Sequence, residues 1–211
     1  MKRERLLWAR KYHFWTLQDW NKIVFCEEIH FLFKGFEQHL SDETRGEHIT
    51  EQHLNQTVKH LQKQMFWGYF TPGGPGSLVP VEGMTDSQKY TSILPDKFEP
   101  FMQTFDGCID VIQQDLVPCH TSTLTTKFLK TKLTVLDWPG NSPDINPIEN
   151  LWSILKRRAC KMDCSTKIKM IENVVKVWFR DEDIKNACSK LVESMPKRAK
   201  KDEGIFTTRK L

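Results

Sequence analysis

Apolar residues recur with two different periods along the chain, and their order predicts strands that alternate with helices. Short runs rich in β-branched and aromatic residues predict strands at residues 23–26, 65–70, 78–83, 109–115 and 133–136. Apolar residues at helical spacing predict helices over residues 6–10, 17–20, 85–94, 124–129, 148–161, 168–178 and 184–192. Three strands followed by alternating helices and strands are typical of an α/β domain.

Residues 137–152 join the last of these strands to a helix through a stiff, proline-rich loop. Pro147 lies where the first turn of a helix tolerates proline, and Asn146 precedes it as a candidate N-cap. Glu149 then projects from the first turn, next to the end of the strand. A carboxylate held there on rigid backbone suits a metal site, but an acidic residue also stabilises a helix N-terminus by charge alone. Spacing does not separate these two explanations.

The length and composition of the chain limit the classes of protein to which it can belong. At 211 residues the chain can bury the core of one domain. It has no apolar run long enough for a membrane span, and charged residues rather than an apolar segment follow Met1, so no signal peptide is predicted. The six cysteines form no C-x-x-C pair, which indicates a reducing, intracellular compartment. The net charge of +4 permits nucleic-acid binding without demonstrating it.

The stretch from Asp137 to Trp152 resembles the D-W-P-x-x-S-P-D-L-N-P-I-E-x-L-W motif of Tc/mariner transposases, with Ile145 in place of Leu as its one departure. The resemblance extends over residues 3–200. Residues 57–60 (T-V-K-H) resemble the end of a variable β-hairpin of the family, and residues 191–198 resemble its closing L-V-x-S-M-P-x-R segment. The family implies a ribonuclease-H-like fold, which the order of predicted elements also matches: a mixed five-stranded sheet flanked by helices, with additional C-terminal helices.

The family also implies a site of three carboxylates. Residues 23–31 resemble V-x-F-S-D-E-S-x-F, residues 113–122 resemble Q-Q-D-N-x-P-x-H-T-S, and the acidic residues that match the catalytic positions are Glu27, Asp115 and Glu149. In the family they hold two Mg²⁺ or Mn²⁺ ions during DNA cleavage and strand transfer. His120 is expected either to orient a carboxylate or water or to serve a structural role at a helix start, and it is counted with Lys156, Arg157 and Arg158 as a candidate DNA contact. The three basic residues also fit a solvated helix face.

Two departures lie at this site. Glu27 stands where the family has Asp, and Leu116 follows Asp115 where the family has Asn. A glutamate carboxylate lies one methylene further from the backbone, and a displacement of about 1 Å can cost about 100-fold in rate. We therefore expect a degenerate or inactive enzyme. The alternatives are an active nuclease in which Glu27 substitutes for Asp, and a domesticated scaffold that binds DNA or protein partners without catalysis. Glu28 is interpreted as an exposed charge at a strand end.

The expected organisation is a helical lead-in at residues 1–22, a catalytic domain at 23–160, helices packed on the same domain at 161–200 and a frayed tail at 201–211. Members of the family carry two helix-turn-helix modules ahead of this domain. The chain begins at the lead-in, so we expect DNA binding to be weak and without sequence preference. A homodimer and an intracellular location, nuclear or cytoplasmic, are the further expectations.

Overall fold

A mixed five-stranded sheet forms the centre of the molecule. The computed structural model describes residues 2–34, 61–83, 85–104 and 109–207. The strands are β1 (Ile23–Lys34), β2 (Leu61–Thr71), β3 (Gly74–Val81), β4 (Val111–Gln113) and β5 (Thr134–Val135), in the order β3-β2-β1-β4-β5. The first three pair antiparallel, whereas β4 and β5 continue the sheet in parallel. The predicted ribonuclease-H-like fold class is confirmed.

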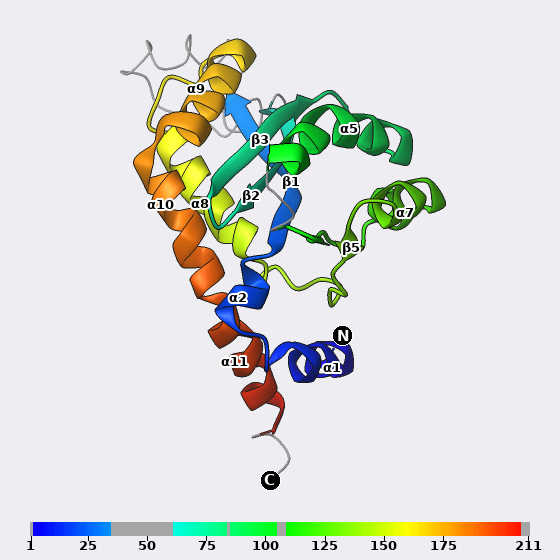
Figure 1. Cartoon of the computed structure of the whole chain (residues 1–211). Helices are drawn as coiled ribbons and strands as arrows, with labels where there is room; N and C mark the ends of the chain where they lie inside the picture. The colour runs from blue at the N-terminus through cyan, green and yellow to red at the C-terminus, as the bar shows by residue number, and fades with distance from the viewer. Residues whose placement is uncertain (1, 35–60, 84, 105–108, 208–211) are drawn as a thin grey trace, which may run out of the picture.

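Helices cover both faces of this sheet (Figure 1). One face carries α8 (Pro147–Ala159), α9 (Lys167–Arg180) and α10 (Glu182–Glu193). The other face carries α5 (Ser87–Thr104), α6 (Pro118–Thr121) and α7 (Thr123–Lys130). Two apolar cores result, one on each side of the sheet. None of the described helices is both long enough and apolar enough to cross a membrane.

Strand β1 is longer than the sequence predicts, and this changes the interpretation of its acidic residues. Antiparallel pairing with β2 continues from Phe25 to Lys34, so Glu27 and Glu28 lie inside a strand. Successive side chains of a strand point to opposite faces. Phe25 faces the core beneath α8 and Cys26 faces the core beneath α5, so Glu27 and Glu28 point to opposite sides of the sheet.

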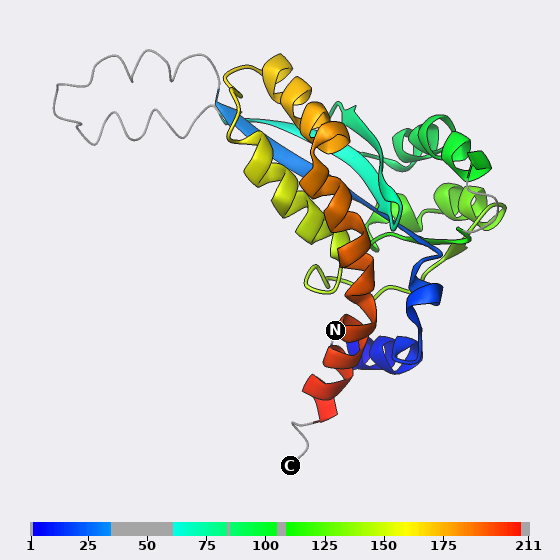
Figure 2. The ribbon, with the colours of Figure 1, turned by 60° about the vertical axis from the view of Figure 1, so that its left-hand side comes forward.

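The terminal helices pack together below the sheet (Figure 2). Helix α1 (Lys2–Tyr12) contacts α11 (Met195–Thr207), and the short α2 (Leu17–Trp20) begins with a capping box between Thr16 and Asp19. Helix α11 continues to Thr207, past residue 200 where the sequence predicts a frayed tail. It is stabilised by contacts that its own sequence does not reveal, because Met195 and Ala199 are fully buried. The hairpin expected to end at residues 57–60 lies outside the described residues.

Gly68 lets helix α8 approach the sheet closely. It pairs with Glu27 across β1 and β2, and a Cβ atom there would lie 2.9 Å from Leu78 Cδ1 and 2.9 Å from Trp152 Cη2. We expect Gly68→Ala to lower the free energy of unfolding by about 1–3 kcal/mol through overpacking, as measured by urea denaturation. Gly140→Ala is the matched control, because the nearest atom to its new Cβ would be 3.6 Å away. Equal stability of the two variants would contradict a tight helix–sheet contact at Gly68.

Candidate active site

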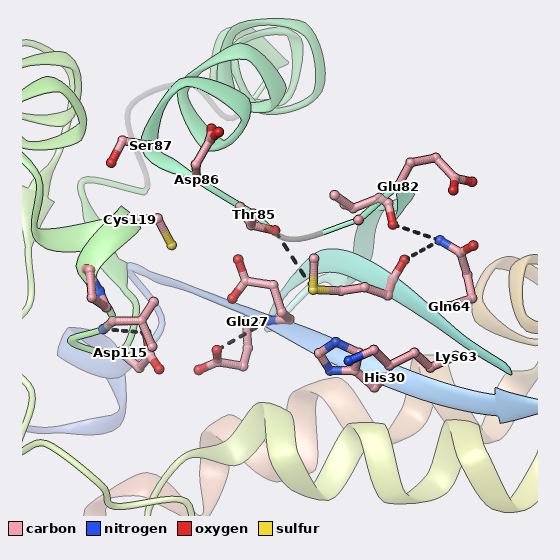
Figure 3. A pocket seen from close by; sticks show the side chains of 16 residues that line it. Glu27, His30, Lys63, Gln64, Glu82, Thr85, Asp86, Ser87, Asp115 and Cys119 are labelled. Atoms are coloured by element: carbon pink, nitrogen blue, oxygen red, sulfur yellow. Dashed lines mark hydrogen bonds between the residues drawn. The ribbon is translucent and has the colours of Figure 1, made fainter. Parts of the chain in front are cut away.

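The parallel pairing of β1 with β4 brings the first two carboxylates together. Phe25 is paired with Gln113, and Glu27 and Asp115 each follow two residues later on their own segments. Because β4 ends at Gln113, Asp115 lies just beyond the C-terminal end of this inner strand. Figure 3 shows the Glu27 and Asp115 side chains converging at one end of a cavity of about 810 Å³.

Helix α8 holds the third carboxylate, Glu149, near enough to Asp115 to feel its charge, although Glu149 is not among the residues that line this cavity. Pro147 opens the helix, and the Asn146 side chain caps it by accepting a hydrogen bond from the Ile148 amide at 3.4 Å. The apolar side of α8 is buried against the sheet through Ile148, Leu151, Trp152, Leu155 and Ala159. Glu149 lies half-buried on the first turn, as the strand–loop–helix pattern predicts.

Burial and mutual repulsion raise the pKa of two of these carboxyl groups. Desolvation raises the pKa of Glu27 most, and the charges of Asp115 and Glu28 add to bring it to about 9. Desolvation likewise raises the pKa of Glu149; the charge of Lys156 opposes this shift and that of Asp115 reinforces it. Asp115 is therefore close enough to act on both other carboxyl groups. Oxygen donors of this kind suit a divalent cation, which would remove the cost of gathering like charges, although among the described residues Glu27, Asp115 and Glu149 do not all lie within 4.8 Å of one another.

Glu27 is held by two hydrogen bonds in addition to its burial. Its Oε1 accepts from the Glu28 amide at 3.2 Å, and its Oε2 accepts from Asn146 Nδ2 at 3.4 Å. The side chain of Asn146 thus links the start of α8 to β1. The sequence identifies Asn146 as an N-cap but gives no sign of this second contact.

His120 is a buried bridge between two carboxylates. Its Nδ1 lies 2.7 Å from Asp115 Oδ1, which also accepts from the Val117 amide at 3.1 Å, and its Nε2 lies 3.3 Å from Glu28 Oε1. Burial lowers the pKa of His120, but the hydrogen bonds to Asp115 and Glu28 outweigh burial and raise that pKa to about 10. The imidazole therefore orients Asp115 Oδ1. Among the described residues, no hydrogen bond reaches Asp115 Oδ2, which leaves this oxygen for a cation.

The structure corrects the prediction for Glu28. Only 12% of its side chain is exposed, and it contacts His120 instead of standing free at a strand end. The reason is that β1 continues through Glu28. Side chains alternate between the two faces of a strand, so Glu28 points to the same face as Cys26, toward α6. Sequence reasoning missed this contact because the strand was expected to stop at residue 26. The exposed Leu116, by contrast, lies beside Gly140.

The basic residues of α8 differ in their surroundings. Arg158 lies 3.6 Å from Asp181 and also pairs with Asp183, so its charge is already matched within the chain. Lys156 and Arg157 are exposed. Lys156 lies over the Phe31 ring and near Glu149, on the site's side of the helix. DNA contact by these residues and by His120 stays a prediction, and the buried His120 side chain favours the orienting role.

The chain is similar in sequence to a family of endonucleases and to transposases. A family model described as DDE superfamily endonuclease matches residues 50–171. The transposable element Tc1 transposase of Caenorhabditis elegans is 32% identical over 200 residues, which cover 92% of this chain and 71% of that protein.

Two solved structures are similar in fold. The Mos1 transposase catalytic domain with Raltegravir and Mg aligns with a TM-score of 0.71 at 14% identity, covering 97% of this chain and 92% of that one. The Mos1 transposase paired-end complex with left transposon end also gives a TM-score of 0.71 at 14% identity, covering 97% of this chain and 60% of that one. At this identity the likeness establishes the fold alone.

Proposed function

Because the chain belongs to the DDE superfamily endonucleases and is a Tc/mariner transposase catalytic domain, we propose that it acts on DNA phosphodiester bonds through divalent cations held by Glu27, Asp115 and Glu149. The observation that carries the proposal is the meeting of Glu27 and Asp115 at one end of the cavity, with Glu149 at the start of α8 close enough for the charge of Asp115 to act on it. Mg²⁺ and Mn²⁺ both suit an all-oxygen donor set.

The proposed roles follow from how each side chain is held. Asp115 presents Oδ2 to a cation while His120 and the Val117 amide hold Oδ1. Glu149 is fixed by the rigid first turn of α8 and by the packing of that helix. Bound cations would supply an acidified water or 3′-hydroxyl nucleophile and stabilise the leaving oxygen. The protein's part is to hold its carboxylates in position around the scissile phosphate.

We further propose that this chemistry is slow in the natural protein. The Glu27 side chain is one methylene longer than the family's Asp, is 8% exposed and is engaged with Asn146 and the Glu28 amide. Its raised pKa also favours a neutral carboxyl group that binds a cation weakly. An impaired enzyme therefore agrees better with the surroundings of Glu27 than an efficient one does.

DNA is the proposed partner, and the nucleus the proposed place of action. The Mos1 relative with a transposon end supports a DNA substrate by analogy of fold. Lys156 and Arg157 are exposed on the helix that carries Glu149, where they would contact phosphates without reading sequence. A homodimer and the division into residues 1–22, 23–160, 161–200 and 201–211 remain predictions of the same proposal.

Nicking of supercoiled plasmid tests the proposed function. We expect slow nicking with Mn²⁺ that disappears with a chelator and falls to the metal-free level in Asp115→Ala, because Asp115 influences both other carboxyl groups. Asp110→Ala is the matched control, since Asp110 is exposed one residue before β4. Nicking that survives in Asp115→Ala would contradict the assigned site. A complete lack of nicking, with DNA binding unchanged in Asp115→Ala, would favour the scaffold alternative.

A further inference from the structure

A second group of donor atoms lies beside the carboxylate site and contains a thiol. Glu28, Cys119 and His120 offer an oxygen, a sulfur and a nitrogen that all lie within 4.8 Å of one another, the one such cluster of three in the part of the chain that the structure describes. Cys119 is 9% exposed, His120 is 1% exposed and Glu28 is largely buried. Figure 3 shows the Cys119 sulfur directed into the cavity, away from the backbone of α6.

The spacing of these atoms fits a tetrahedral metal. Ligands at the distances that Zn²⁺ prefers for nitrogen and oxygen are separated from each other by about 3.3–3.5 Å in a regular tetrahedron. His120 Nε2 and Glu28 Oε1 are 3.3 Å apart, so these two donors already stand at the required separation. The Cys119 sulfur lies within 4.8 Å of a His120 ring nitrogen and a Glu28 carboxylate oxygen, so it needs to move closer by about 1.3 Å at most to reach a tetrahedral position.

A further carboxylate, that of Asp115, contacts the other ring nitrogen of His120. His120 Nδ1 lies 2.7 Å from Asp115 Oδ1, which leaves Nε2 facing Glu28 and Cys119. Metal-ligating histidines nearly always donate their other ring N–H to a carboxylate or carbonyl, which sets the tautomer and the ring orientation. The site therefore has the supporting contact that distinguishes an organised metal site from a chance meeting of side chains.

The donor set differs in kind from that of the carboxylate site. Glu27, Asp115 and Glu149 offer oxygen only, which suits Mg²⁺ and Mn²⁺, whereas a thiolate and an imidazole select softer ions such as Zn²⁺. Glu28 also points to the opposite side of the sheet from Glu27. The two sites consequently share no ligand, although Asp115 would orient His120 in one and bind a cation in the other.

We propose that Glu28, Cys119 and His120 form a Zn²⁺ site with one open coordination position. Binding expels the Cys119 thiol proton and the proton on His120 Nε2, and it leaves Nδ1–H donating to Asp115. The ion would replace the weak Glu28–His120 contact with two metal bonds and would stiffen α6 against β1. The phosphodiester chemistry proposed above is not needed for this site.

Co²⁺ is the probe that tests the site, because its spectrum reports both thiolate ligation and tetrahedral geometry. We expect the whole chain to bind one Co²⁺ at this site, identified by its sulfur-to-cobalt charge-transfer band, and Zn²⁺ to displace that ion. Cys119→Ser should abolish that band and weaken Zn²⁺ binding at least about 100-fold. Cys160→Ser is the matched control, because Cys160 is exposed at the end of α8 and should leave both signals unchanged.

Two further variants keep the result interpretable if Cys119→Ser folds poorly. Glu28→Gln should keep the charge-transfer band but weaken Zn²⁺ binding about 100-fold, and Glu27→Gln should alter neither. An absent band in the folded natural protein would overturn the proposal. So would a band that persists in Cys119→Ser or that is lost in Cys160→Ser. Loss of plasmid nicking in Glu27→Gln with an unchanged Co²⁺ spectrum would separate this site from the catalytic one.

Discussion

Replacing Glu27 by aspartate is expected to raise the rate of Mn²⁺-dependent DNA cleavage by about 100-fold. The longer glutamate carries its carboxyl group one methylene further from β1, which misplaces it by about 1 Å or more relative to an aspartate. A shorter side chain also withdraws the carboxyl group from Asn146 Nδ2 and from the Glu28 amide, which hold it in the present structure. The oxygen atoms then become available to a cation at the position that the family's Asp supplies.

Cleavage of a labelled duplex with Mn²⁺, followed over time on a denaturing gel, measures this gain. Glu27→Gln is the control for charge, because it keeps the length of the side chain and removes its ability to ionise; we expect it to show no cleavage. Asp115→Ala in the Glu27→Asp background should remove the gain. Fast cleavage by the natural protein, with no increase in Glu27→Asp, would show that glutamate serves the site as well as aspartate.

The largest expected loss of stability follows from Trp178→Ala. Trp178 on α9 is fully buried, its Nε1 donates to the Gly76 carbonyl oxygen at 2.7 Å, and its ring lies 5.1 Å from that of Trp152. Truncation of a buried tryptophan creates a large cavity and costs about 3–5 kcal/mol. Because Trp152 belongs to the helix that carries Glu149, this cavity also loosens the support of the site.

Urea denaturation of three variants separates the effect of the lost apolar volume from the effect of the lost hydrogen bond. Trp178→Phe keeps most of the apolar volume but leaves the Gly76 carbonyl without its donor, so we expect a smaller loss of about 1–3 kcal/mol. Phe179→Ala removes a neighbouring aromatic ring that is 54% exposed and should change stability by about 0.5 kcal/mol. A Trp178→Ala protein as stable as Phe179→Ala would refute the role of this contact between α9 and β3.

The start of helix α8 could be predicted because its signals are local. A cap residue, a proline in the first turn and an apolar face at helical spacing act within a few residues of one another. Asn146, Pro147 and Ile148 supply them, and they place Glu149 on the first turn. Pro80 shows a similar local effect: it lies in the edge strand β3, and proline lacks the N–H that an inner strand needs.

The extent of β1 could not be predicted in the same way. Residues 27 and 28 are acidic, so local propensity argues against a strand there. Pairing with β2, whose residues lie far along the chain, carries the strand through them. Only this pairing decides that Glu28 faces α6 and meets Cys119 and His120.

By itself the sequence determined the ancestry, the fold class and the residues that match the family's three carboxylates, because these rest on motifs and local periodicity. The tertiary structure decided how each carboxylate is held. Burial, the reach of Asn146 to Glu27 and the bridge from His120 to Asp115 join segments that are distant in sequence. Desolvation and through-space charge depend on those distant neighbours, so the surroundings of Glu27 could be known only after the chain was folded.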